Sequence, residues 1–278
     1  MLAAALLAQS RPGISAQALS GRIRRFRAFL ERGGGRVEDT AAGPRIREQK
    51  ALARFLRDGL VERLEGPEDT VFRVLPEKRI TMEYYKNAIL HRFAPASLLA
   101  AVIRARGEES FSPLDLQEGL RFQLFLFRYE FVFDPDADEE DIATRALSQL
   151  ESAEAITLMN DGSWVVLNKA RVGEMAELTL NFLESYYVVL RGLQQVRDKD
   201  LAPKQLAREM QKAGRQFRGY ADIQRPEALS LVNLENALKA LAESGIYHLR
   251  TGGGGVEIDA QGSADYLSRL RWLLRKDT

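Results

Sequence analysis

AITLMNDGSWVVL, residues 155–167, is the stretch that decides the fold of this chain. Two short runs rich in β-branched and apolar residues flank the turn Asn160-Asp161-Gly162. An Asn-Asp-Gly turn supplies the positive φ that a tight hairpin needs. The stretch therefore predicts a β-hairpin, in a chain whose other segments show mainly helical periodicity.

Two further stretches predict hairpins of the same kind. Residues 71–75 follow the turn 66–69, and residues 246–249 run through a series of glycines into residues 256–258. With residues 69, 161 and 253 taken as their turn positions, the three hairpins lie 92 residues apart. Even spacing of this kind indicates an internal repeat.

Each predicted hairpin follows a group of predicted helices. They span residues 2–9, 15–31 and 45–64, then 97–106, 113–127 and 138–153, then 178–196, 203–217 and 229–243. Residues 77–93 are expected to link the first two groups, residues 264–275 to form a closing helix, and residues 33–35 and 41–44 to form a mobile loop.

Helix–helix–helix–hairpin is the arrangement of a winged-helix domain. We therefore predict a mainly α fold with short β-hairpins, built from three tandem winged-helix-like units at residues 1–76, 77–168 and 169–278. The second unit includes the linking helix, and the third includes the closing helix. An irregular helical domain with β-hairpins is the alternative.

Composition excludes several kinds of chemistry. Apolar residues make up 45% of the 278 residues and charged residues 28%, as in ordinary folded soluble proteins. The chain has no cysteine, so disulfides, thiolate nucleophiles and cysteine-ligated zinc are excluded, which fits a reducing compartment. Its two histidines, His91 and His248, lie far apart in sequence and disfavour a multi-histidine metal site. We predict no metal and no cofactor.

Hydropathy predicts no membrane-spanning segment. No stretch reaches the roughly 18–20 apolar residues that cross a bilayer. Residues 1–9 are apolar, but no positively charged segment precedes them, so they are expected to pack as a helix and not to act as a signal peptide. Any contact with a membrane would be peripheral.

Basic residues concentrate in the first quarter of the chain. The net charge is +1, yet residues 1–75 contain fourteen Lys or Arg and nine Asp or Glu. On a helix, Arg22, Arg25, Arg32 and Arg36 fall along one side. A solvated helix face is one interpretation, and a patch for phosphate-bearing partners, either anionic lipid or nucleic acid, is the other.

The segment 79–91 contains the most informative polar pattern. On a helix, Tyr84, Asn87 and His91 are three and four residues apart and line one face, with Tyr85 beside them. Such a line could bind a ligand, although it is more often a satisfied polar seam between two packed surfaces.

The same segment carries a family resemblance. Two tyrosines, a basic residue, Asn87 and then His91 resemble the start of the C-terminal region of PlsB-type and mitochondrial-type glycerol-3-phosphate acyltransferases, and of dihydroxyacetone-phosphate acyltransferases. Three other stretches agree with this family in order along the chain. They are LAAALL at 2–7, RYEFVF at 128–133 and FLESYY at 182–187.

The residues that this family uses for catalysis are missing here. Its members carry His-x-x-x-x-Asp, in which the histidine takes a proton from the glycerol 3-phosphate hydroxyl and the aspartate orients it. Five residues after His91 stands Ala96, and five after His248 stands Gly253. The family's Glu-Gly-Thr-Arg phosphate motif is also absent; residues 118–121 read Glu-Gly-Leu-Arg.

The resemblance implies a non-catalytic region that supports a catalytic domain and positions it at the inner face of the cell membrane, for phospholipid biosynthesis. We expect the chain to be inactive alone, as a fragment, a split gene product or a paralogue without its enzyme. Tyr84, Tyr85, Asn87 and His91 would then form a partly exposed docking seam, with an apolar patch of residues such as Ile80, Phe93 and Leu98 nearby. The catalytic domain is the expected partner, and an anionic membrane surface a further one.

A winged-helix nucleic-acid-binding or regulatory protein is the rival interpretation. In it, the helix predicted at 45–64 would enter a nucleic-acid groove. The nearly neutral net charge disfavours a nucleic-acid partner.

Overall fold

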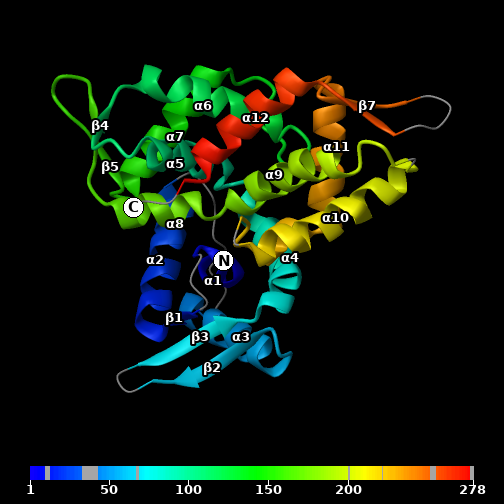
Figure 1. Cartoon of the computed structure of the whole chain (residues 1–278). Coiled ribbons are helices and arrows are strands. Elements are labelled where there is room, and N and C mark those ends of the chain that lie inside the picture. The colour runs from blue at the N-terminus through cyan, green and yellow to red at the C-terminus, as the bar shows by residue number, and fades with distance from the viewer. Residues whose placement is uncertain are drawn as a thin grey trace.

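Helix α9 (Leu180–Gln195) is the central helix of the protein. The computed structural model describes residues 1–9, 13–32, 43–66, 69–199, 201–220, 222–250 and 255–275. Almost every residue of α9 from Leu180 to Leu193 is buried, on all sides of the helix. A helix that is buried all round must be covered by neighbours. Helices α10, α11 and α12 pack against it and form that cover (Figure 1).

The described residues of the first third form three helices and a three-stranded antiparallel sheet of order β1-β3-β2. The elements are α1 (Leu2–Leu7), β1 (Gly13–Ser15), α2 (Ala16–Arg32), α3 (Gly43–Arg57), β2 (Val61–Glu65) and β3 (Thr70–Val74). The prediction that α3 continues to residue 64 is wrong, because Gly59 takes a φ of +64° and turns the chain back. Residues after it pair with β3 instead, with Arg63 opposite Phe72.

The middle third repeats this order of elements after a linking helix. The elements are η1 (Pro76–Lys78), α4 (Arg79–Leu90), α5 (Ala94–Arg106), β4 (Ser110–Phe111), α6 (Pro113–Leu126), α7 (Glu139–Ser152), β5 (Ile156–Leu158) and β6 (Trp164–Val166). The hairpin predicted from the Asn160-Asp161-Gly162 turn is confirmed, and Gly162 has the positive φ of +82° that the turn requires. Strand β4 adds to it in the order β4-β6-β5.

The last third is helical with one two-stranded hairpin. Its elements are α8 (Lys169–Ala176), α9, α10 (Pro203–Gly219), η2 (Pro226–Leu229), α11 (Leu231–Glu243), β7 (Tyr247–Leu249), β8 (Val256–Ile258) and α12 (Ala260–Leu273). The third predicted hairpin is confirmed by the pairing of β7 with β8. Its turn residues 251–254 lie outside the described residues, as do residues 33–42, which contain most of the predicted loop.

A mainly helical fold with small antiparallel sheets is thus what the chain adopts. In the first two thirds a short strand, β1 after α1 or β4 after α5, pairs with the last strand of the hairpin. In the last third the backbone N–H of Val256 donates to the carbonyl of Arg197 at 2.8 Å, at the corresponding place after α9.

The three parts share one hydrophobic core. Helix α1 packs against α4, α5 packs against α7 and α8, and α12 crosses both α9 and α5 (Figure 1). Within the described ranges no single helix is long and apolar enough to cross a membrane. The helical segments Pro76–Leu90 and Ala94–Arg106, which meet at a sharp bend, have the length and apolar composition of a span only when taken together.

Two helical glycines give a test of this packing. A Cβ on Gly214 would lie 2.3 Å from Leu229 and 3.0 Å from Val188, whereas a Cβ on Gly173 would meet nothing within 4 Å. We expect Gly214→Ala to lower the free energy of unfolding by about 1–3 kcal/mol through overpacking. Gly173→Ala should raise it by roughly 0.5–1 kcal/mol through helix propensity. Urea denaturation measures both, and equal effects would contradict the packing of α10 on α9.

Candidate docking site on helix α4

Helix α4 has two polar faces with opposite environments. Arg79, Glu83 and Lys86 are spaced four and three residues apart, so they share one face, and all three are buried. Tyr84, Asn87 and His91 lie on the other side and are exposed to solvent. The inner face therefore holds the helix in place, while the outer face is exposed to solvent.

The inner face joins α4 to η2 by an ion pair. The guanidinium of Arg79 makes two bonds to the carboxylate of Glu227, each 2.6 Å long. Both side chains are almost completely buried. Charge and hydrogen bonds from Arg79 outweigh the burial that would raise the pKa of Glu227, so that pKa is lowered.

An asparagine on α9 connects the other two charges of this face. The Lys86 ammonium donates to Asn181 Oδ1 at 2.7 Å and to the carbonyl of Leu178 at 3.0 Å. The Asn181 amide nitrogen donates to Glu83 Oε1, which also accepts a 2.9 Å bond from Asn233 of α11. Lys86 and Glu83 are thus joined through Asn181.

Burial shifts the pKa values of Glu83 and Lys86 in the directions that favour their uncharged forms. It raises the pKa of Glu83 to about 7 against the opposing charge of Lys86. It lowers the pKa of Lys86 against the opposing charge of Glu83. The charge of Lys86, followed by the hydrogen bonds from Asn233 and Asn181, opposes this rise and favours a charged Glu83.

The network continues through Arg225 into α8 and α9. Arg225 bonds to Glu184 at 2.6 Å and to Glu177 at 2.6 Å. Its backbone N–H also donates to Glu184, at 2.9 Å. Burial alone would lower the pKa of Arg225, but these two carboxylates outweigh it and raise that pKa. Four segments, α4, α8, α9 and η2, are therefore tied together by charges inside the protein.

The outer face contains the four residues expected to form the docking seam. Tyr84 is 78% exposed, and Asn87 and His91 are exposed beside it. Tyr85 is half-covered, with its ring 5.2 Å from that of Phe55 on α3. The structure thus brings Tyr84, Asn87 and His91 together on one open surface.

The apolar patch expected nearby is only partly present. Ile80 is exposed, but Phe93 and Leu98 are fully buried, which corrects that expectation. Phe93 ends α4 by turning inward and stacks on Phe29 of α2, with ring centroids 5.0 Å apart. The exposed apolar residues near the seam come from other segments, namely Val132 and Val232.

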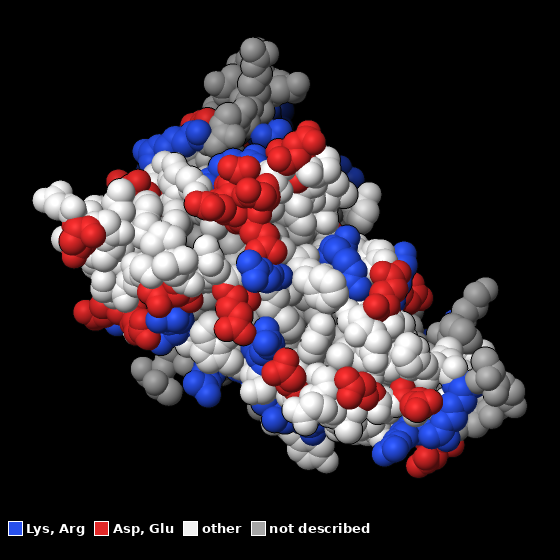
Figure 2. Space-filling view, turned by 90° about the horizontal axis from the view of Figure 1, so that it is seen from above, with Lys and Arg blue, Asp and Glu red and all other residues white. Residues whose placement is uncertain are grey.

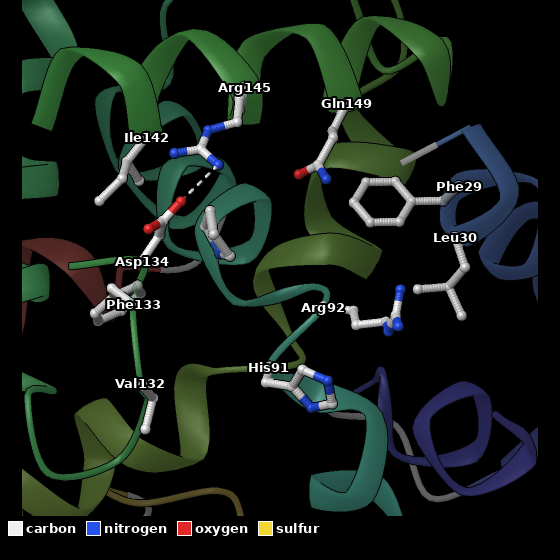
Figure 3. Close-up of a pocket in the computed structure, with 11 residues that line it drawn as sticks. Phe29, Leu30, His91, Arg92, Val132, Phe133, Asp134, Ile142, Arg145 and Gln149 are labelled. Carbon is white, nitrogen blue, oxygen red and sulfur yellow. Dashed lines mark hydrogen bonds and ion pairs between the residues drawn. The ribbon is translucent and has the colours of Figure 1, made fainter. Parts of the chain in front are cut away.

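Two adjoining hollows border the C-terminal end of α4. The first, of about 430 Å³, lies between Asn87 and His91 of α4, Glu130 in the segment after α6, and Asn236 of α11. The second, of about 220 Å³, extends from His91 toward α2 and α7. Figure 3 shows His91 and Arg92 on one side of it and the Asp134–Arg145 pair across from them. His91 and Val132 line both hollows, so the two form one recessed region next to the seam.

The predicted basic patch takes another arrangement. Arg22 is buried, donates to the carbonyl of Ala5 at 2.8 Å and pairs with Glu174 at 3.1 Å. Arg25 binds the same carboxylate at 2.7 Å, and Arg32 donates to the carbonyl of Ser152. Arg36 lies outside the described residues. Arg22 and Arg25 therefore hold α2 against α8 and do not form an open stripe.

Sequence reasoning missed the buried charges of α4. A usable signal was present, because Arg79, Glu83 and Lys86 share a face with Met82 and Leu90, and apolar neighbours on the same face indicate burial. Within the described ranges no group of three or more His, Cys, Asp or Glu side chains could hold a metal.

Comparison with known proteins identifies a family for this chain. Residues 1–250 match the family described as the glycerol-3-phosphate acyltransferase C-terminal region. The chain belongs to this family. A glycerol-3-phosphate acyltransferase of Aeromonas hydrophila is 31% identical over 149 residues, which cover 50% of this chain and 18% of that relative. The match thus spans less than a fifth of the relative's length.

The stretches that carry the family resemblance lie in the core or at the recessed region. Glu184 and Tyr186 of FLESYY are buried, and the Tyr186 hydroxyl donates to the carbonyl of Leu126 at 2.7 Å. Glu130 and Val132 of RYEFVF line the larger hollow.

Substitution of one asparagine at each face of α4 tests whether the inner face, and not the outer one, stabilises the fold. Asn181→Ala removes a partner from both Lys86 and Glu83, so we expect the free energy of unfolding to fall by about 3 kcal/mol. Asn87→Ala removes an exposed side chain, so its effect should stay within roughly 0.5 kcal/mol. Thermal denaturation of the two variants measures the difference. A large loss for Asn87→Ala would mean that the outer face holds the chain's own parts together.

Proposed function

We propose that this chain is the non-catalytic C-terminal region of a glycerol-3-phosphate acyltransferase and that it docks a catalytic domain on the outer face of α4. The observation that carries the proposal is the contrast between the two faces of α4. A buried ion network fixes one face, and the other presents Tyr84, Asn87 and His91 beside two hollows. A fixed, exposed polar and aromatic surface is suited to binding another protein with little ordering cost.

Acyl transfer itself is assigned to another part of the enzyme. Deprotonating the glycerol 3-phosphate hydroxyl needs a base with an orienting partner. Neither His91 nor His248 has an aspartate five residues on, and the two lie on α4's end and on β7. This chain would contribute through positioning.

The order of elements favours winged-helix-like units within this region. Helix, strand, helix, helix and hairpin follow one another in the first two thirds, with sheet orders β1-β3-β2 and β4-β6-β5. We propose that the last third is a third such unit without its first strand. Family membership and a net charge of +1 favour acyltransferase support over nucleic-acid binding as the use of these units.

Charge on the surface supports a peripheral position at an anionic membrane. Lys and Arg are interspersed with Asp and Glu over the described residues of the face seen in Figure 2. Helix α10 differs, because Arg208, Lys212 and Arg215 are exposed at spacings of four and three along one side. The opposite side of α10 is buried against α9 and α11. We propose that α10, and not Arg22 and Arg25, faces the anionic inner leaflet.

A chimaera tests the docking function. This chain would replace the corresponding region of the Aeromonas relative, and acylation of glycerol 3-phosphate would be measured. We expect activity from the chimaera and none from the isolated chain. Tyr84→Ala with His91→Ala should lower the chimaera's activity about tenfold or more, because removing central interface residues costs above 1 kcal/mol. Leu114→Ala, at a 73% exposed position on α6, is the matched control and should have no effect.

A chimaera that acylates glycerol 3-phosphate no faster than the catalytic part alone would contradict the docking function. Acyl transfer by the isolated chain would contradict the assignment of catalysis elsewhere. Unchanged activity after the double substitution on α4 would place the docking surface on another face.

Vesicle binding tests the membrane position. Arg208→Glu, Lys212→Glu and Arg215→Glu together should weaken sedimentation with phosphatidylglycerol-containing vesicles by about tenfold or more, because each basic residue near the surface contributes about 1 kcal/mol. Arg24→Glu, Lys50→Glu and Arg57→Glu change the same charge on α2 and α3 and should have a smaller effect. Equal losses would show that only net charge matters, and no binding to anionic vesicles would remove the membrane role of α10.

A further inference from the structure

The segment after α6 is fixed to α11 by its polar groups. The Arg128 guanidinium donates to the carbonyl of Ala240 at 2.9 Å, and the Tyr129 hydroxyl donates to Glu243. The Asn236 amide donates to the carbonyl of Tyr129 at 3.3 Å and to Glu130 Oε2 at 2.9 Å. These bonds hold the Glu130 side chain at the edge of the larger hollow.

One oxygen of Glu130 is left without a donor. Oε1 is buried and accepts no hydrogen bond from any described residue. The carboxylate makes no ion pair among the described residues either, since the neighbouring Arg128 bonds to the carbonyls of Phe125 and Ala240 and lies over the Phe125 ring. A buried acceptor without a partner loses the free energy of its hydration and gains nothing in return.

The hollow that Glu130 lines suits a long cationic side chain. Besides Glu130, its polar lining is made by Asn87, His91, Asn233 and Asn236. The amide oxygen of an asparagine can accept hydrogen bonds. Its apolar lining includes Val232, which is 63% exposed, and Val132, which is 94% exposed. Such walls cover an aliphatic stem while the carboxylate and amides meet a charged head.

We infer that this hollow is a receptor for the guanidinium of an arginine, presented by the protein that docks on α4. The inference rests on the proposed docking function, because it places the arginine on the docking partner. Arginine fits better than lysine, since a planar guanidinium donates to several acceptors at once and sheds its hydration more readily. Its charge would supply the missing partner of Glu130.

Proton linkage follows from the position of Glu130. Burial, with a smaller repulsion from Glu83, raises the pKa of Glu130 to about 8 although Asn236 opposes the rise. The charged or titratable groups around it are Glu83 and His91 on α4, Tyr186 on α9, and Arg128 and Tyr129 next to it in the chain. Below pH 8 the carboxyl is protonated, so a guanidinium must displace a proton, and its apparent affinity rises with pH.

The test uses the isolated chain and a capped amino acid. N-acetyl-arginine amide should bind saturably in a calorimetric or NMR titration, with a Kd on the order of 1 mM, as for one charge-assisted contact. Its neutral isostere, N-acetyl-citrulline amide, should bind at least tenfold more weakly. Affinity for the arginine probe should rise about fourfold between pH 7.5 and 9, where an ordinary histidine is already mostly neutral.

Two different variants test the hollow, so that misfolding of one variant does not decide the result. Glu130→Gln removes the charge, and Val232→Trp fills the mouth of the hollow from an exposed position. Each should weaken arginine binding at least tenfold, while Glu140→Gln, an exposed carboxyl on α7, should leave it unchanged. Absence of saturable binding, equal binding of the citrulline probe, or undiminished binding to Glu130→Gln would overturn the inference.

The chimaera separates this inference from the docking function. An active chimaera that is unaffected by Glu130→Gln would overturn the arginine receptor and leave the docking function standing. Arginine binding by the isolated chain together with an inactive chimaera would overturn the docking function and leave the receptor standing. Loss of chimaera activity in Glu130→Gln, with arginine binding to the isolated chain, is the expected result.

Discussion

The bidentate pair between Arg79 and Glu227 is the interaction on which the position of α4 depends. Helix α4 carries polar residues on two sides, so amphipathicity alone does not decide which side faces inward. The pair buries the side with the charges, because Glu227 on η2 offers a matching carboxylate inside the protein. Removing one partner would strand the other as a buried charge, which costs far more than the pair gains over an apolar replacement. The network therefore specifies an orientation more than it adds stability.

Fixing the inner face sets the geometry of the outer one. Lys86 and Glu83 are joined through Asn181 of α9, so α4 cannot rotate about its axis without breaking bonds to the central helix. Tyr84, Asn87 and His91 are consequently presented at defined positions. A surface held in this way loses little conformational entropy when a partner binds, which lowers the free-energy cost of association.

Much of the fold could be predicted from the sequence, and the reason is local. The Asn160-Asp161-Gly162 turn requires a positive φ that glycine supplies at Gly162, so that hairpin follows from three residues. Helix α3 shows the opposite case: periodicity continues past Gly59, and only pairing with β3 shows that Val61–Glu65 is a strand. Tertiary pairing of this kind leaves no trace in a helical pattern.

The candidate site divides in the same way. The helical spacing of Tyr84, Asn87 and His91 predicts that they share one side of α4, but their exposure and the partners of Arg79 and Arg22 could not be read from the chain. Glu227 lies 148 residues from Arg79, and Glu174 lies far from Arg22. From the sequence alone, a basic residue on a helix is expected to be exposed. Only the fold shows that a carboxylate distant in sequence pairs with it, because sequence periodicity contains no information on such pairs.

The balance of buried charges explains why Glu130, a carboxylate without an ion-pair partner among the described residues, lies at the edge of the charged cluster. Around α4 the buried cations Arg79, Lys86, Arg104 and Arg225 are matched by Glu83, Glu177, Glu184 and Glu227, each within one connected cluster. Glu130 lies at the edge of that cluster, close enough to Glu83 for repulsion, yet none of those cations pairs with it. Any cation placed inside to neutralise it would compete with Lys86 for the same acids. A positive group arriving from outside can pair with Glu130 without disturbing the interior, because Glu130 lines the hollow next to the docking seam.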